Sequence, residues 1–287
     1  MNNTKQAVSY EHTVQQYYND ALLCYSQIMG DRWHHGDPDA VAAGLSRVRA
    51  CEILEEKIAA LAELDSTKKV LDFGCGIGGP TLYMAKISGA SFIGVTNNER
   101  VIQKASENAK QAGLADKVTF MTLEDTGYQN LPFPDNTFDA ITFYECLCHL
   151  TDKARAFAEF ARILKPNGRL VGDDWVQRPF GENQTETQIL KFMEPVNRFF
   201  FIPWHGTVEG YKKMMEDAGL EVFIARDLYP GVKCFGYQDE QTPQWLSYEG
   251  PDARTFQEGE KAIVDARHAG VFSLGLWVAE KRTKVKK

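Results

Sequence analysis

Paired cysteines, long apolar runs and an N-terminal leader pattern are all missing from this 287-residue sequence. The six cysteines form no CxxC pair, which argues against a zinc site and favours a reducing compartment; they are Cys24, Cys51, Cys75, Cys146, Cys148 and Cys234. No apolar run approaches the roughly 18 residues that a membrane span needs, and the start shows no basic segment followed by an apolar one. We therefore expect no metal site, no membrane span and a cytoplasmic location.

An excess of positive charge is missing as well. Lys and Arg total 32 against 39 Asp and Glu, which gives a net charge of −7, and the only basic stripe is the final KRTKVKK. Nucleic acid is therefore not an expected partner. With 44% hydrophobic residues and no internal repeat or low-complexity segment, the sequence predicts one globular unit. A homo-oligomer stays an open alternative.

What the sequence does contain is a βαβ unit with a glycine-rich turn at residues 69–98. Val70 and Leu71 belong to a short apolar strand, and Asp72 stands where that strand ends. Four glycines then let the chain turn tightly and let a ligand approach the backbone: Gly74, Gly76, Gly78 and Gly79. The GxGxxG spacing alone suits a dinucleotide as well as another nucleoside. The acid before it favours a ligand without phosphate, because a carboxylate can orient an ammonium group or a water.

Apolar segments along the chain predict an α/β fold with a mostly parallel, seven-stranded, Rossmann-like sheet. After the first strand, further strands are expected at 91–95, 118–121, 138–144, 169–172, 221–227 and 271–280. Helices are expected at 1–30, 40–64, 81–87 and 100–112, and more helices are inserted after the fifth strand within 178–250. The helix at 40–64 has an apolar face that we expect to be buried, formed by Leu45, Val48, Leu54, Ile58, Leu61 and Leu64.

This pattern divides the sequence into three parts. Residues 1–66 form an N-terminal helical lid and the first core helix, and residues 67–177 form the cofactor-binding core. Residues 178–287 form a helical cap over the substrate and the last strands of the same domain.

Polar residues follow successive strands, at the sheet edge where ligands of open α/β sheets bind. Asn97 and Asn98 follow the strand at 91–95, and their amides can bond the two hydroxyls of a ribose. Glu124 and Asp125 form an acidic turn after the next strand, where an adenine amino group is expected to find an acceptor.

Two titratable residues follow the strand at 138–144. Glu145 and His149 are four positions apart, and they share one face if this segment is helical. The adjacent His34 and His35 lie in a polar turn that is expected to be exposed or to face a ligand, and they are expected to point apart rather than bind a metal. Arg47 is expected to be solvated.

The segment DFGCGIGG at 72–79 resembles motif I of the S-adenosylmethionine-dependent methyltransferases, and LPFPDNTFD at 131–139 resembles another signature of their class I. The opening YYND…MGDRWHHGD resembles methyltransferases that act on tocopherol, sterols and isoprenyl diphosphates. The resemblance implies S-adenosylmethionine as cofactor and a lid whose Tyr18 and Trp33 line the pocket over the reactive methyl. The cofactor-binding residues that follow are Tyr18, Asp72, Gly74, Gly76, Gly78, Asn97, Asn98, Glu124 and Asp125.

Later segments carry a more specific resemblance. YECLCHL at 144–150 and ILKPNGRLVGDDWV at 163–176 resemble the C-methyltransferases that act on sterol side chains. VNRFF at 196–200 and the end EGEKAIVDARHAGVFSLGLWVAEK resemble geranyl diphosphate C-methyltransferase. By this resemblance Glu145 is the base, and Trp33 and Phe200 stabilise a cation.

Methylation of an alkene carbon leaves a carbocation that must be shielded from water and then lose a proton. Aromatic faces can stabilise such a cation by about 1–2 kcal/mol each in a desolvated pocket, and a carboxylate or imidazole can accept the proton. The catalytic candidates are Glu145 and His149. The candidate substrate-binding wall is aromatic and consists of Trp33, Tyr144, Trp175, Phe200 and Trp204.

Together these residues and resemblances predict an S-adenosylmethionine-dependent C-methyltransferase, of the EC 2.1.1 class, that acts on an isoprenoid or terpenoid double bond through a carbocation. Cyclisation after methylation is an open extension, and Mg²⁺ is expected only if the substrate is a diphosphate. The nearest alternative is an N- or O-methyltransferase of a small metabolite. An alternative from another class is a cofactor-binding regulatory protein without turnover.

Overall fold

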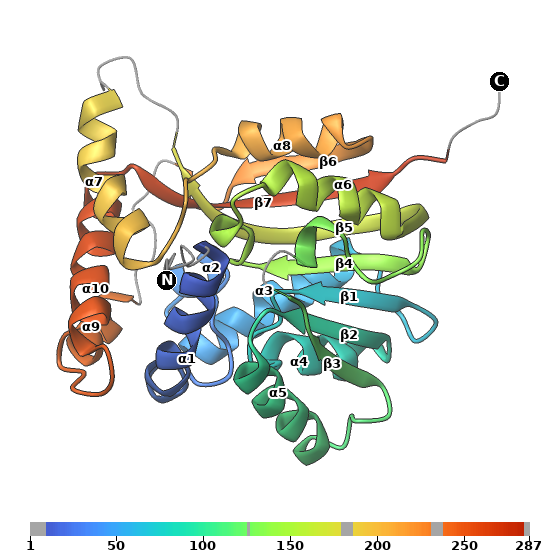
Figure 1. Cartoon of the computed structure of the whole chain (residues 1–287), viewed down its shortest axis with the longest axis horizontal. Coiled ribbons are helices and arrows are strands. Elements are labelled where there is room, and N and C mark those ends of the chain that lie inside the picture. Colours follow the sequence, from blue (N-terminus) through green and yellow to red (C-terminus); the bar gives the residue numbers. More distant parts are fainter. Residues whose placement is uncertain (1–9, 125–126, 179–185, 231–237, 284–287) are drawn as a thin grey trace, which may run out of the picture.

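A seven-stranded sheet forms the centre of the protein in its computed structural model, which describes residues 10–124, 127–178, 186–230 and 238–283 (Figure 1). The strand order is β3-β2-β1-β4-β5-β7-β6. The strands are β1 (Lys69–Phe73), β2 (Ser91–Thr96), β3 (Val118–Thr122), β4 (Phe138–Tyr144), β5 (Leu164–Gln177), β6 (Leu220–Asp227) and β7 (Phe272–Lys281). Only β7 runs antiparallel to its neighbours β5 and β6. The predicted mostly parallel, Rossmann-like sheet is confirmed.

Helices cover both faces of the sheet. One face packs against α3 (Arg47–Leu61) and α4 (Gly79–Ser88) through a buried cluster that includes Leu54, Ile58 and Met84. The opposite face packs against α6 (Lys153–Ile163) and α8 (Val208–Asp217), where Phe157 and Tyr211 are fully buried. The helix after β2 is α5 (Glu99–Gln111), which begins where the Asn98 side chain accepts a hydrogen bond from the Val101 N–H.

A second group of helices stands at the end of the sheet to which β1 and β4 point (Figure 1). It consists of α1 (Tyr10–Ile28), α2 (Pro38–Ala42), α7 (Glu186–Phe199), α9 (Gln238–Leu246) and α10 (Ala253–His268). A separate aromatic cluster joins α1 to α9 and α10 and includes Tyr17, Tyr25, Trp245 and Phe256. The predicted lid and the helical insertion after the fifth strand are therefore present. No helix in the described ranges has the length and apolarity to cross a membrane.

The helix predicted at 40–64 is interrupted, and part of its predicted inner face is wrong. Gly44 has a φ of +73°, which ends α2, and the hydroxyl group of Ser46 then caps a new helix, α3. Because the helical phase restarts at this cap, Leu45 and Val48 are 42% and 50% exposed. The later positions of the pattern, such as Leu54 and Ile58, are buried as predicted.

Strand β6 confirms the strand predicted at 221–227, and it divides the helices of the cap into two groups. Residues 178–250 include the core strand β6, so α7 precedes this strand and α9 follows it. Helix α10 lies beyond the predicted insertion and packs against α7 and α9. As a result, two insertions on either side of β6 build one wall of the site described below.

A large, fully buried side chain, Trp277, allows a prediction about the free energy of unfolding. Trp277 on β7 is fully buried, stacks on Tyr211 with ring centres 4.8 Å apart and donates a hydrogen bond to the Val208 carbonyl. Trp277→Ala should therefore lower the free energy of unfolding by about 3–5 kcal/mol. Phe223→Ala, at a 53% exposed position on β6, should change it by less than about 0.5 kcal/mol. Urea unfolding measures both values, and equal losses would contradict the assigned core.

Candidate active site

The glycine turn between β1 and α4 brings backbone close to other elements. Gly74 has a φ of +77°, and a Cβ there would lie 2.4 Å from the Cβ of Cys146. Gly76 has a φ of +50° and faces the ring of Trp33. Gly78 has a φ of +85°, but a Cβ there would meet the ring of Phe120, so this glycine serves the turn and its packing. No side chain caps the start of helix α4 by a hydrogen bond.

Asp72 is buried beneath this turn. Its carboxylate accepts hydrogen bonds from the hydroxyl groups of Thr81 and Thr142, the second at 3.0 Å. Burial raises the pKa of Asp72 to about 6, although both hydroxyl groups favour its charged form. Because this pKa is still below 7, the carboxylate is mainly ionised at neutral pH, although burial disfavours its charge.

A long cleft of about 1080 Å³ runs along the carboxyl ends of β1, β2, β3 and β4. Six residues that the sequence predicts for the cofactor line it, namely Tyr18, Asp72, Gly74, Gly76, Asn97 and Glu124. Two others do not line it: Gly78, for the reason above, and Asn98, which is buried, caps α5 and donates to the carbonyl of Gln15. Asp125 lies outside the described residues.

Helix α1 closes one side of this long cleft. The Gln15 amide donates to the Asn97 carbonyl at 2.8 Å, and the Tyr18 hydroxyl lies 2.9 Å from Nε2 of His149. The ring of Tyr18 is stacked on Trp33 with ring centres 6.3 Å apart. These contacts tie the lid to the ends of β2 and β4.

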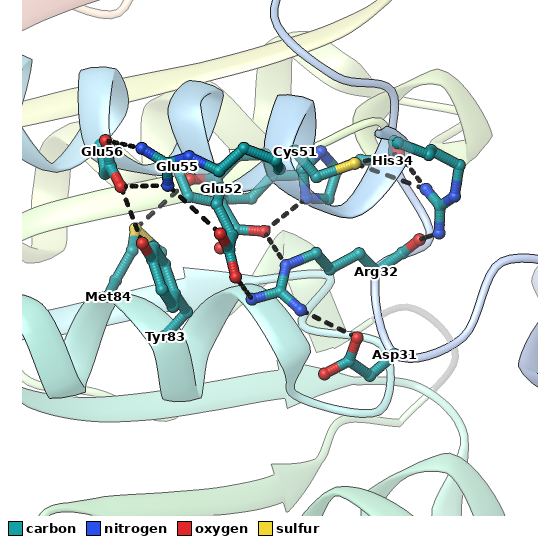
Figure 2. Close-up of polar contacts among 12 residues, drawn as sticks. Asp31, Arg32, His34, Cys51, Glu52, Glu55, Glu56, Tyr83 and Met84 are labelled. Atoms are coloured by element: carbon teal, nitrogen blue, oxygen red, sulfur yellow. Dashed lines mark hydrogen bonds and ion pairs between the residues drawn. The ribbon is translucent and has the colours of Figure 1, made fainter. Parts of the chain in front are cut away.

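The segment after α1 is anchored by a buried ion-pair cluster around Glu55 (Figure 2). Nε of Arg32 donates to the Glu55 carboxylate at 2.8 Å, and Nε2 of His34 lies 2.9 Å from the same oxygen. Arg47 donates to the carbonyls of Met29 and Arg32. The prediction that Arg47 is solvated is therefore wrong, because its guanidinium ties two parts of the lid together.

A second cavity of about 460 Å³ adjoins the long cleft, and we call it the aromatic cavity. Six aromatic side chains line it: Tyr25, Trp33, Trp175, Phe200, Trp245 and Phe256. Trp33 and Glu145 line both spaces, so the two spaces meet at these residues. Of the predicted aromatic wall, Trp33, Trp175 and Phe200 are found in this cavity.

Two residues of the predicted wall lie elsewhere. Tyr144 lines the long cleft, where its ring lies 4.7 Å from that of His34. Trp204 lines neither space and is 38% exposed. Its ring instead covers the ammonium of Lys153 at 3.9 Å, and its Nε1 donates to the Thr151 carbonyl. The substrate-binding prediction for Trp204 is therefore contradicted, because this cation–π contact holds it at the surface.

Glu145 occupies the junction between the long cleft and the aromatic cavity. Its carboxylate accepts hydrogen bonds from the His35 N–H at 2.5 Å, from Nδ1 of His35 at 2.6 Å and from Nε1 of Trp175 at 2.5 Å. Burial raises the pKa of Glu145, but the adjacent His35 outweighs burial and lowers it below its ordinary value. Its φ of +46° is unusual for a residue with a side chain, and the three donors hold it there.

Asp173, on the neighbouring strand β5, is a second buried carboxyl group next to Glu145. Its backbone carbonyl accepts the Glu145 N–H, and its fully buried carboxyl group has no hydrogen-bond partner within the described part of the protein. Burial and then the nearby Glu145 raise the pKa of Asp173 well above its usual range. Burial and the nearby Glu145 therefore both disfavour the charged form of Asp173, whereas His35 favours the charged form of Glu145.

His149 lies further along the long cleft from Glu145. The predicted shared helical face is wrong, because Glu145 turns the backbone in a left-handed conformation and only a 3₁₀ turn (Leu147–His149) follows. Both side chains nevertheless line the long cleft. Nδ1 of His149 lies 3.1 Å from the Phe201 carbonyl, and burial lowers the pKa of His149 to about 4.

Sequence reasoning missed several residues of this site. The sequence predicts that His35 is exposed or faces a ligand; it is 3% exposed and lines the aromatic cavity, but its hydrogen bond to Glu145 was not predicted. Helix α10 contributes Phe256, Glu260 and Ile263 to the aromatic cavity. Their spacing of four and three residues places them on one helical face, which is a signal that the sequence contained. In the described ranges, no group of three or more acidic, His or Cys side chains is arranged to hold a metal ion.

Comparisons with known proteins agree with this geometry. A family model described as a methyltransferase domain matches residues 71–172. Tocopherol O-methyltransferase of Arabidopsis thaliana is 28% identical over 244 residues, which make up 81% of this chain and 67% of that protein. Sterol 24-C-methyltransferase of Saccharomyces cerevisiae is 29% identical over 223 residues, which make up 76% of this chain and 55% of that protein. The match thus spans little more than half of the yeast relative.

A similar fold occurs among solved structures. Geranyl diphosphate C-methyltransferase from Streptomyces coelicolor A3(2), in complex with Mg²⁺, geranyl diphosphate and S-adenosyl-L-homocysteine, has a TM-score of 0.71. The two proteins are 20% identical, and the match covers 96% of this chain and 99% of the other. At this identity the likeness shows the shared fold.

The cluster around Glu55 predicts a large loss of stability from a small change. Glu55→Gln removes a buried charge that pairs with Arg32 and His34, so the free energy of unfolding should fall by roughly 3 kcal/mol. Glu56→Gln on the same helix is the matched control, because the Glu56 side chain is 38% exposed and its pairing with Arg49 contributes at most about 1 kcal/mol. Denaturant unfolding separates the two, and similar losses would contradict the anchoring role.

The raised pKa of Asp72 predicts how the free energy of unfolding varies with pH. The pKa of Asp72 is about 6 in the folded protein against about 3.9 in an unfolded polypeptide, so the folded state binds the proton more tightly. The contribution of Asp72 to stability should therefore fall by roughly 2 kcal/mol as pH rises from about 4 to about 7. The free energy of unfolding of wild type minus that of Asp72→Asn, measured across this range, reports the change. A difference that does not vary with pH would contradict it.

Proposed function

We propose that this protein, a class I S-adenosylmethionine-dependent methyltransferase, transfers the methyl group to a carbon of an isoprenoid or terpenoid double bond. The observation that supports this proposal is the anionic Glu145 at the junction of the long cleft and the aromatic cavity. A substrate double bond in the aromatic cavity would meet the cofactor methyl at this junction. Cyclisation follows in this scheme if a second double bond reaches the cation before it loses a proton.

The residues of the long cleft fit the cofactor. Asp72 would supply an anion for the ammonium group of the methionine moiety, and Gly74 and Gly76 line the same cleft beside it. Asn97 would bond the ribose, and Glu124 would accept from the nucleoside at the end of β3. When bound, the cofactor supplies an electrophilic methyl group on a sulfonium.

The aromatic cavity is suited to a short-lived positive centre. Six aromatic side chains line it, and an aromatic ring can stabilise a cation without capturing it covalently. Glu145 adds a fixed negative charge that His35 and Trp175 orient. Because the surroundings are apolar, this charge acts over a short distance with little screening.

The protonation state of Glu145 favours methylation of carbon over methylation of a hydroxyl group. A hydroxyl nucleophile needs a base that can compete for a weakly acidic proton, and three hydrogen bonds and a lowered pKa make Glu145 a poor base of that kind. A carbocation is a far stronger acid than a hydroxyl group, so carbon methylation does not require Glu145 to be a strong base.

An N- or O-methyltransferase of a small metabolite is the second candidate. The observation that favours it is the imidazole of His149, which is neutral at pH 7 and lies in the long cleft next to Tyr18. Mg²⁺ enters either proposal only with a diphosphate substrate. A cytoplasmic location and a homo-oligomeric assembly stay predictions from the sequence.

The position of the transferred methyl group tests this proposal. The protein is incubated with S-adenosylmethionine labelled with ¹³C in its methyl group and with a panel of prenyl alcohols, prenyl diphosphates, prenylated indoles and sterols. The account predicts a product whose labelled methyl is bonded to carbon in the ¹³C NMR spectrum. A label found only on oxygen or nitrogen would contradict it.

The charge of Glu145 should matter for turnover and not for cofactor binding. Glu145→Gln keeps the shape but removes the anion, so kcat should fall by about 100-fold or more. The Kd for S-adenosyl-L-homocysteine, measured by calorimetry, should stay within about threefold, because Asp72 and the glycine turn are unchanged. Trp204→Phe, outside both spaces, is the control and should keep wild-type turnover. Unchanged kcat in Glu145→Gln would remove Glu145 from the mechanism.

A further inference from the structure

The carboxylate of Glu145 has little capacity left to accept a proton. Its two oxygens offer about four acceptor positions, and the two N–H groups of His35 and the indole N–H of Trp175 occupy three of them. These donors also fix the carboxylate in place. The geometry suits a counter-ion that stays charged throughout the reaction, so the proton that ends the reaction needs another acceptor.

Tyr18 and His149 form a hydrogen-bonded pair that can supply this acceptor. The Phe201 carbonyl can only accept a hydrogen bond, so Nδ1 of His149, 3.1 Å away, carries the ring proton. Nε2 of the neutral imidazole therefore has a free electron pair and accepts from the Tyr18 hydroxyl at 2.9 Å. This arrangement gives Tyr18 a base behind its hydroxyl group.

The pair stands beside the reactive junction. Tyr18 and His149 both line the long cleft together with Glu145. The ring of Tyr18 is parallel to that of Trp33, which lines both the long cleft and the aromatic cavity. Through this ring stack Tyr18 adjoins one of the two residues that form the junction.

The surroundings keep the imidazole ready to accept a proton and then release it. Burial, opposed only by the Phe201 carbonyl, lowers the pKa of His149 to about 4, and the Lys153 ammonium lowers it further. Lys153 itself donates to the carbonyls of Cys148, Leu150 and Trp204, so it is fixed by the backbone around His149. The imidazole is therefore neutral before each turnover.

We propose that Tyr18 is a catalytic residue that relays the final proton from the substrate cation to His149. The electron pair of the breaking C–H bond becomes the new π bond of the product, and the proton goes to the Tyr18 oxygen. The Tyr18 hydroxyl proton moves at the same time to Nε2 of His149, so the positive charge leaves the substrate and ends on the imidazolium. Because Tyr18 belongs to α1 and His149 to the 3₁₀ turn after β4, the relay depends on the packing of these two elements. This inference rests on the carbon methylation proposed above.

The relay predicts a change in the products, because a cation without its base loses a different proton or captures water. With an alkene that the wild type methylates, gas chromatography and mass spectrometry give the ratio of the main alkene to other alkene isomers and alcohols. Tyr18→Phe and His149→Asn should each lower this ratio by at least about tenfold, and the double variant should behave as the single ones do. Tyr17→Phe is the matched control on the same helix, because Tyr17 lines neither space and its hydroxyl pairs with Tyr25 rather than with His149.

Three results would each overturn the proposed relay. Wild-type product ratios in both variants would overturn the relay while leaving carbon methylation intact, even if kcat falls. Loss of S-adenosyl-L-homocysteine affinity by more than about tenfold in Tyr18→Phe would also overturn it, because the hydroxyl would then serve the cofactor. Absence of any carbon-methylated product from the wild type would overturn the proposed function and the relay together.

A measurement on the unaltered protein complements the variants. ¹⁵N NMR of the His149 ring with S-adenosyl-L-homocysteine bound reports which nitrogen carries the proton. The relay requires a neutral ring that is protonated at Nδ1 from about pH 5 to about pH 8. A ring protonated at Nε2, or at both nitrogens, would overturn it.

Discussion

The hydrogen bonds between His35 and Glu145 are the interaction on which the site depends. A carboxylate buried between a cofactor cleft and a ring-lined cavity would gain a proton if it had no partners, because desolvation disfavours its charge. His35 donates twice and Trp175 once, and together they keep the charge on Glu145. These donors come from the lid segment and from β5, so the electrostatics of the site exist only in the assembled fold.

The rest of the structure explains how His35 reaches that position. The segment that carries it is tied to α3 through Glu55, which pairs with Arg32 (Figure 2). Arg47, also on α3, donates to the carbonyls of Met29 and Arg32. The Tyr229 hydroxyl bonds the carbonyl of Gly36 at 3.2 Å. A Cβ at Gly36 would lie 2.5 Å from the Cβ of Ala50, so glycine lets this segment lie directly on α3. These contacts of the segment with α3 and Tyr229 thus fix the position of His35, and through it the position of Glu145.

The sequence predicted the parts of the site that depend on local order. Parallel strands place their carboxyl ends along one edge, and this rule was sufficient to bring Asp72, Asn97 and Glu145 to one cleft. The rule failed at Asn98, because its side chain caps α5 instead of facing the cleft. Trp204, predicted as part of the aromatic wall, covers a lysine instead. It also could not reveal the pairing of His35 with Glu145, because 110 residues separate them and only the packed tertiary structure brings them together. The face of α10 was readable from its spacing, but its position over the cavity follows from its packing on α7 and α9.

The central claim is that Glu145 is an anion held between two cavities, and its ionisation state is the most direct test. The ¹³C resonance of Cδ in the Glu145 carboxyl group, assigned by its loss in a variant and followed with S-adenosyl-L-homocysteine bound, reports that state. The account predicts the chemical shift of an ionised carboxylate that does not titrate from about pH 5 to about pH 8. A resonance of the protonated acid, or a titration centred inside that range, would contradict it.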